Sequence, residues 1–111
     1  MRYEKGNLLD KKFKAIADST RREILILLKT SPLKAGEIAN HFTISFASVS
    51  HHLQKLEESG LVVSKRTGKY KEYHLCIEAL DDIYLWIVNL RQYRIKATIR
   101  IIQQVPSKNC G

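Results

Sequence analysis

The segment Ser45–Gly60, which reads SFASVSHHLQKLEESG, decides the fold of this chain. Its apolar residues recur at intervals of three, four and three positions, the spacing of one helix face: Phe46, Val49, Leu53 and Leu56. Ser45 is a preferred N-cap residue, and Gly60 is a preferred residue just beyond a helix C-terminus. The pattern predicts a helix over Phe46–Ser59 that packs one face on a core.

The opposite face of this helix is small and polar. It carries Ala47, His51, Gln54 and Glu58, flanked by Ser48, Ser50 and Lys55. Small side chains let a helix lie deep in a DNA groove, and Ser, His and Gln exchange hydrogen bonds with base edges and phosphates. An ordinary solvated helix surface has the same composition. The helix alone leaves both interpretations open.

Three shorter helices are predicted before it. Apolar residues at helical spacing indicate the first over Leu8–Ala17. A second begins at Thr20 and Glu23, which have the spacing of a capping box. A third, of about two turns, is expected over 35–42 and is followed by a short polar connector. The third helix and the one after the connector form a helix-turn-helix pair.

A basic hairpin is predicted after the pair. Extended segments lie on either side of the turn Thr67-Gly68-Lys69. Four of the hairpin's residues are basic and one is acidic: Lys65, Arg66, Lys69 and Lys71 against Glu72. The basic residues of such a hairpin either bind DNA phosphates or prevent aggregation at an exposed sheet edge. The neighbouring helix favours the first role. The order of elements predicts a mainly α winged helix-turn-helix domain with a small β-hairpin wing.

These elements define the predicted DNA-binding site. It combines the N-cap, the polar helix face and the hairpin: Ser45, Ala47, Ser48, Ser50, His51, Gln54, Lys55, Arg66 and Lys69. In such domains the second helix of the pair enters the major groove. An enzyme is not expected, because the chain has no phosphate-binding loop and no hydrolase or metalloprotease motif. A winged helix that binds protein instead of DNA is the alternative function.

The C-terminal part is predicted to be helical over Ile77–Val105, as one long helix or as two with a bend. Its apolar surface is wider than one small domain covers, which predicts a homodimer. The expected interface on this helix includes Ile83, Trp86, Ile87 and Leu90. Residues 1–105 are expected to form a single DNA-binding and dimerisation domain, and 106–111 a flexible tail.

The composition of the 111 residues indicates a polyanionic partner. Nineteen Lys and Arg against eleven Asp and Glu give a net charge of +8, which favours nucleic acid over an anionic membrane. The longest apolar run, Ile83–Val88, is too short to span a membrane, and the polar start lacks a secretory signal, so a cytoplasmic location is expected. Cys76 and Cys110 make no disulfide framework and are expected to be reduced.

Three stretches resemble the ArsR/SmtB-type winged-helix repressors. Phe13–Leu25 (FKAIADSTRREIL) is similar to the opening of that family. Ser48–Leu56 (SVSHHLQKL), continued by Ser59–Val62 (SGLV), is similar to its recognition helix, and Tyr70–Leu75 (YKEYHL) to its wing. The resemblance implies a dimeric transcriptional repressor that binds an imperfect palindrome near a promoter. Members of that family pair through the first and last helices, which adds Phe13 of the first helix to the expected interface.

Two positions depart from the pattern of the family. Ser19 replaces the usual Pro after the Asp, which changes a helix start. Phe46 stands where the family commonly has a polar residue, at the DNA-facing start of the recognition helix. Its ring either contacts a thymine methyl or folds back onto the core, and its place in the apolar stripe favours the core.

Many members of the family release DNA when a metal binds, through a Cys-x-Cys cluster or through Asp and His ligands on the last helix. The chain has neither pattern, and carboxylates alone are a poor replacement for thiolate or imidazole ligands, so no metal and no cofactor are expected. Of the four histidines only His51 is expected to face DNA, while His52 takes a hydrogen-bonded packing role. A thiol-responsive regulator that joins Cys76 to Cys110 is a further alternative.

The end of the chain is strongly basic. It contains five basic residues and no acid: Arg91, Arg94, Lys96, Arg100 and Lys108. A solvated helix surface is the default interpretation. Contact with an acidic protein or a membrane-associated partner is the alternative that this pattern leaves open.

Overall fold

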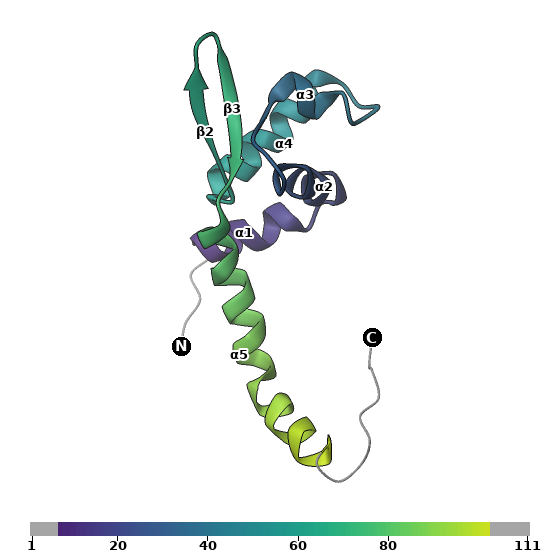
Figure 1. The fold of residues 1–111 in the computed structure, drawn as a ribbon, viewed down its shortest axis with the longest axis vertical. Coiled ribbons are helices and arrows are strands. Elements are labelled where there is room, and N and C mark those ends of the chain that lie inside the picture. Colours follow the sequence, from purple (N-terminus) through teal and green to yellow (C-terminus); the bar gives the residue numbers. More distant parts are fainter. Residues whose placement is uncertain (1–6, 103–111) are drawn as a thin grey trace.

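The computed structural model describes residues 7–102, and the side chains of residues 7–92. In this part of the chain the elements follow in the order α1 (Leu8–Ile16), α2 (Ser19–Leu28), β1 (Leu33–Lys34), α3 (Ala35–Ala39), α4 (Phe46–Ser59), β2 (Val62–Thr67), β3 (Tyr70–Leu75) and α5 (Ile77–Ile102). Figure 1 shows α2, α3, α4 and the β2–β3 hairpin gathered at one end of the molecule, while α5 extends away from them. The predicted winged helix-turn-helix architecture is confirmed.

Strands β2 and β3 form the hairpin that we call the wing, Val62–Leu75. They pair antiparallel along their whole length. In the turn between them Gly68 has a φ of 63°, a left-handed conformation that glycine adopts without strain. The short strand β1 pairs with the other edge of β3, so the sheet order is β1-β3-β2. The sequence did not predict β1, because two residues leave no alternating pattern.

Helix α4 has the predicted bounds and caps. The Ser45 hydroxyl accepts a hydrogen bond from the backbone N–H of Ser48 at 3.1 Å, and Gly60 ends the helix with a φ of 82°. The side chains of three stripe residues are at most 1% exposed and form the centre of the core: Val49, Leu53 and Leu56. They pack with Ile24 of α2 and Ile38 of α3, so α4 is held against both preceding helices.

Phe46 is the exception to the predicted stripe. Its side chain is 57% exposed, so the expectation that it folds back onto the core is wrong. As the first residue of α4 it lies past the buried part of the helix, beside the start of α3 and the wing. Helical spacing identifies the side of a helix on which a residue lies, but not where along the axis the core ends.

Two helix ends differ from the predictions. The N-cap of α2 is Asp18, whose carboxylate accepts from the backbone N–H of Arg21 at 3.0 Å, so the capping box predicted at Thr20 and Glu23 is wrong. A carboxylate is the stronger acceptor, and its charge is favourable at a helix N-terminus. Helix α3 ends at Ala39 instead of continuing to 42, and Phe42 packs against the core from the segment after it.

Helix α5 is a single helix, which resolves the alternative that the sequence left open. Helix α1 packs against its first turns. There Lys12, only 3% exposed, forms an ion pair with Asp82, and the ring of Phe13 meets Trp86 edge to face with centroids 5.3 Å apart. Ile83 is 7% exposed, so it belongs to the core of its own protomer and offers little surface to a dimer, contrary to the prediction.

Some sequence predictions fall on the last part of the chain. The expected helix end and domain boundary at Val105 and the tail 106–111 lie outside the described residues. Arg91 is exposed, but the basic side chains from Arg94 onward are not described, so a contact with an acidic or membrane-associated partner stays a prediction. Within residues 7–102 no helix combines the length and the hydropathy needed to cross a membrane.

Candidate nucleic-acid interface

All nine residues of the predicted DNA-binding site have exposed side chains. Seven come from α4 or its N-cap and two from the wing: Ser45, Ala47, Ser48, Ser50, His51, Gln54 and Lys55, with Arg66 and Lys69. Helix α4 and strand β2 pack together, so both groups belong to one body. The structure thus brings the polar helix face and the basic wing to the same end of the molecule, as Figure 1 shows.

The N-terminal turn of α4 is suited to bind an anion such as a phosphate. Its backbone N–H groups carry the positive end of the helix dipole, and no acidic residue lies in that turn. The Ser45 hydroxyl caps the turn and also donates to the hydroxyl oxygen of Ser48 at 3.0 Å. Ser45 therefore orders the start of the helix, and Ala47, Ser48 and His51 are the groups that a DNA groove would meet.

The C-terminal half of α4 is less suited to DNA. Glu58 accepts a hydrogen bond from Gln54 at 3.4 Å, and another of its oxygens lies 3.8 Å from the ammonium of Lys55. Both predicted DNA contacts are thus partnered with a carboxylate, whose charge repels phosphate. The part of α4 that is best suited to DNA is therefore its first two turns.

A cluster around Arg21 supports α4 from behind. The guanidinium donates to the carbonyl oxygens of Ala15 at 2.8 Å and Lys14 at 3.1 Å, at the end of α1. Its Nη1 lies 3.2 Å from Nδ1 of His52 on α4. One side chain therefore joins α1, α2 and α4. The packing role predicted for His52 is confirmed.

The charge of Asp18 completes this cluster. Its carboxylate lies 3.7 Å from Nδ1 of His52. The hydrogen bond from the backbone N–H of Arg21 is the main cause that lowers the pKa of Asp18 below its usual value, and the charges of protonated His52 and of Arg21 lower it further. Sequence reasoning missed the role of Arg21, because its partners lie on two other helices.

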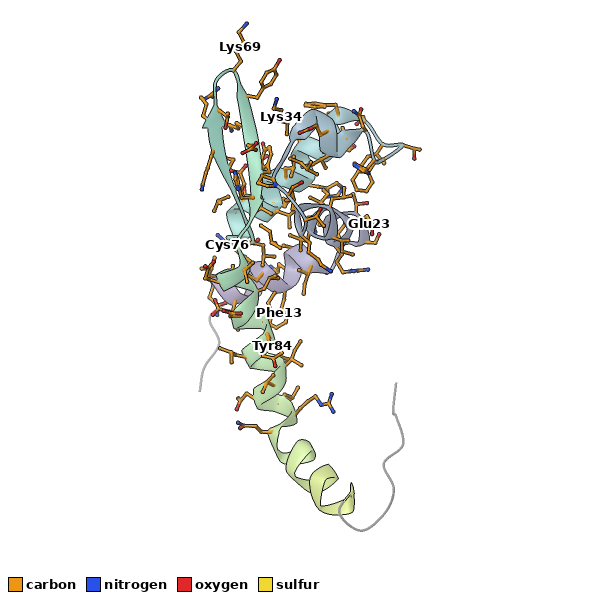
Figure 2. The ribbon with its side chains drawn as sticks, viewed as in Figure 1. Phe13, Glu23, Lys34, Lys69, Cys76 and Tyr84 are labelled. Carbon is orange, nitrogen blue, oxygen red and sulfur yellow. The ribbon has the colours of Figure 1, made fainter. Side chains whose placement is uncertain are left out.

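The wing presents its basic residues outward. Lys65, Arg66 and Lys69 are exposed, and Figure 2 shows Lys69 at the tip, pointing away from the body of the molecule. The acidic Glu72 lies opposite Lys65 in the register, with an oxygen 3.2 Å from Nε2 of His74. The acid is thus engaged within the sheet, which leaves the tip positively charged.

Lys34 and Tyr70 connect the wing to the helices. The Lys34 ammonium lies 4.4 Å from the centre of the Tyr70 ring, a cation–π contact between β1 and the start of β3. In Figure 2 Lys34 lies between the wing and α3. Neither residue was predicted to belong to the site. Nothing in the local sequence pairs them, because the contact exists only once the sheet has formed.

A groove runs between the first turn of α4, the start of α3 and the wing. Its volume is about 430 Å³, and its lining is basic, aromatic and small: Lys34, Ala35, Gly36, Phe46, Ser50, Lys69, Tyr70, Lys71 and Tyr73. Three lysines along one groove suit a chain of phosphates. The groove therefore extends the candidate interface from the helix to the wing.

A second exposed surface lies on α5 and is apolar. Its large side chains are between 37% and 66% exposed: Tyr84, Leu85, Trp86, Ile87 and Leu90. Together with Phe13, whose ring meets Trp86, they form what we call the α5 face, and Figure 2 shows Phe13 and Tyr84 where α5 leaves the body of the molecule, away from the wing. Because Tyr84 to Ile87 are consecutive, these side chains surround most of the helix, and exposed apolar area of this kind marks an interaction surface.

Possible sensor groups are few in the described part of the chain. Residues 7–92 hold no group of three or more His, Cys, Asp and Glu placed to bind a metal ion. Cys76 is half-buried, with Sγ 3.6 Å from a carboxylate oxygen of Glu78. Cys110 lies outside the described residues, so the expectation that both thiols are reduced and the alternative of a thiol-responsive regulator stay predictions.

Comparison with known proteins places these features in a family. Residues 18–64 match the family described as bacterial regulatory protein, arsR family. The transcriptional repressor SdpR of Bacillus subtilis (strain 168) is 46% identical over 77 residues, which cover 69% of this chain and 86% of that protein. The arsenical resistance operon repressor of Staphylococcus aureus is 34% identical over 99 residues, covering 87% and 90%. The solved structure of the ArsR-like transcriptional regulator from Rhodococcus sp. RHA1 superposes with a TM-score of 0.71 at 26% identity, over 91% of this chain and 95% of that one.

Proposed function

This chain belongs to the ArsR family of bacterial regulatory proteins, and we propose that it is a transcriptional repressor that binds operator DNA as a homodimer through α4 and the wing. The observation that carries the proposal is the exposed, acid-free first turn of α4 beside a groove with three lysines. A helix of this kind enters the major groove, and the lysines hold the phosphates next to it. The proposal includes no catalytic activity.

The site residues divide into two roles. Ala47, Ser48, Ser50 and His51 lie in the first two turns of α4 and would contact base edges. Arg66 and Lys69 of the wing would contact phosphates, whereas Lys55 of α4 is paired with Glu58 and is not assigned a phosphate contact. Phosphate contacts strengthen binding to every sequence, whereas base contacts select among sequences.

The α5 face is the proposed dimer surface. Phe13, Trp86, Ile87 and Leu90 keep the roles that the sequence assigned to them, and Tyr84 and Leu85 extend the surface. Burial against a second copy would remove this apolar area from water. A two-fold dimer presents two identical recognition helices, so the operator would be an imperfect palindrome with half-site centres about 34 to 36 Å apart. Operator binding also implies a cytoplasmic location.

The test is selection of DNA from the organism's own genome, followed by titration of the selected duplex and a scrambled one at several salt concentrations. We expect one selected motif with two-fold symmetry, and an affinity that falls steeply with salt. A protein that binds no duplex at low salt would instead be a winged helix that binds protein. A selected site without two-fold symmetry would contradict the homodimer.

A further inference from the structure

An exposed aromatic ring stands at the start of the proposed recognition helix. Phe46 is the first residue of α4 and is 57% exposed, although the groove beside it is lined by lysines, tyrosines and small residues. An exposed phenyl ring gains free energy when apolar surface covers it. The other residues that line this groove are basic, small or tyrosine, and they leave more than half of the ring exposed, so a partner that covers the ring must supply the apolar group.

The position of Phe46 along the helix is well defined. The Ser45 cap holds the first turn, with hydrogen bonds to the backbone N–H and the hydroxyl of Ser48. Phe46 and Ser50 are four residues apart, so they lie on the same flank of α4, the flank that faces the wing across the groove. His52 lies on the opposite flank, against Arg21. The ring is therefore presented between the base-contacting face and the lysines of the wing.

This arrangement limits what the ring can meet in DNA. N-terminal residues of a recognition helix contact base edges in the major groove. The apolar group on those edges is the 5-methyl of thymine, which Phe side chains contact in known readout. Lys34, Lys69 and Lys71 line the same groove and would hold the phosphates beside that base, which sets its position relative to the ring.

We propose that Phe46 is a specificity-determining residue that selects thymine at one position in each half-site, by packing its ring on the 5-methyl group. This inference rests on the proposed function. It assigns a base preference to a residue whose apolar character is unusual for a DNA-facing helix start. The partner is a methyl group, so its contribution is separable from hydrogen bonding.

The test removes the methyl group and the ring separately and together. Each thymine of the selected operator is replaced in turn by deoxyuridine, which lacks only the methyl, in both half-sites. These duplexes are titrated with the native protein and with Phe46→Ala. Tyr70→Ala is the matched control, because Tyr70 is an equally exposed ring on the wing side of the same groove. Thermal unfolding of each variant verifies that the fold is intact.

We expect one thymine per half-site at which deoxyuridine weakens binding of the native protein about three- to fourfold per methyl, or roughly tenfold for both half-sites. Phe46→Ala should bind the normal operator more weakly and lose this sensitivity to deoxyuridine. Tyr70→Ala should keep it. At the other thymines, replacement by deoxyuridine should change the affinity of the native protein and of Phe46→Ala by the same factor.

Two results would overturn the inference while leaving the proposed function intact. In one, the native protein binds the operator but tolerates deoxyuridine everywhere, which would mean that the ring covers sugar or inserts between bases. In the other, Phe46→Ala is as sensitive to deoxyuridine as the native protein. Absence of operator binding by the native protein would overturn the proposed function and this inference with it.

Discussion

Arg21 of α2 donates through Nη1 to Nδ1 of His52 on α4, over 3.2 Å. A guanidinium has no acceptor, so His52 must accept at Nδ1 and carry its proton on Nε2. The same guanidinium holds two carbonyl oxygens at the end of α1. Through Arg21, helix α4 is therefore held against the C-terminal end of α1.

Two neighbouring histidines should give opposite results. His52 is 17% exposed at its side chain, so His52→Ala leaves Nη1 of Arg21 without its His52 partner and should lower the free energy of unfolding by about 1 to 3 kcal/mol. His51→Ala, at an exposed position, should change stability by less than about 0.5 kcal/mol. The measurement is denaturant unfolding of both variants. Equal stability losses would show that the two side chains are not on different faces.

His51 should also contribute to base selection. His51→Ala is expected to cost about 1 to 3 kcal/mol of operator binding and to relax the preference at one base position in each half-site. Titration against a series of single-base operator variants measures this directly. If the base preference of His51→Ala were unchanged, His51 would not contact a base, and the base contacts would come from other residues in the first two turns of α4.

The wing should contribute affinity without selectivity. Arg66→Ala and Lys69→Ala should each weaken binding to operator and scrambled DNA alike, and lower the slope of log affinity against log salt by about 1 for each phosphate that the variant no longer neutralises. Lys29→Ala is the control, because Lys29 is exposed beyond the end of α2, away from the groove. A change of sequence preference in the wing variants would reverse the roles assigned to wing and helix.

The α5 face should hold the dimer. Ile87→Asp or Leu90→Asp places a charge on a surface that the partner would cover, and should give monomer or insoluble protein. Val63→Asp, at a similarly exposed apolar position on β2, should remain dimeric. Light scattering at micromolar concentration distinguishes the states. A monomeric native protein would contradict the prediction.

Acid should destabilise α2 through Asp18. The pKa of Asp18 is lower in the folded protein than its usual value of 3.8. Its stabilising contribution is therefore complete above that usual value and is lost as the pH falls through the lower folded pKa. Asp18→Asn keeps a cap acceptor but removes the charge, so its unfolding free energy should depend less on pH between about 7 and 2. Parallel pH profiles for both proteins would contradict this.

Metals should not release the protein from DNA. The described residues hold no cluster of ligands, and the sequence lacks the Cys-x-Cys pattern of metal-sensing relatives. Zinc, cadmium or arsenite added at stoichiometric concentration should leave operator affinity unchanged. A metal-dependent loss of binding that disappears when Cys76 is replaced would reveal a site that includes this thiol.

The elements that the sequence predicted correctly are those whose defining residues are neighbours in the chain. Helix α4 was predicted with both ends because its N-cap, its apolar stripe and Gly60 lie within one segment. The wing was predicted because its turn and its paired strands are adjacent. The exposed polar face of α4 and the basic tip followed from these elements, since phase and turn position alone determine where such side chains point.

Tertiary structure decided whether a residue on the apolar side of a helix is buried, and which residues it contacts. Phe46 shares a helix side with Val49 but lies past the end of the core, whereas Ile83 shares an apolar face with Leu90 but is already covered by its own protomer. The contacts of Arg21 with His52 and of Lys34 with Tyr70 join segments far apart in the chain. Spacing determines direction around a helix axis, but burial depends on which surface lies opposite, and only the packing of distant elements supplies that surface.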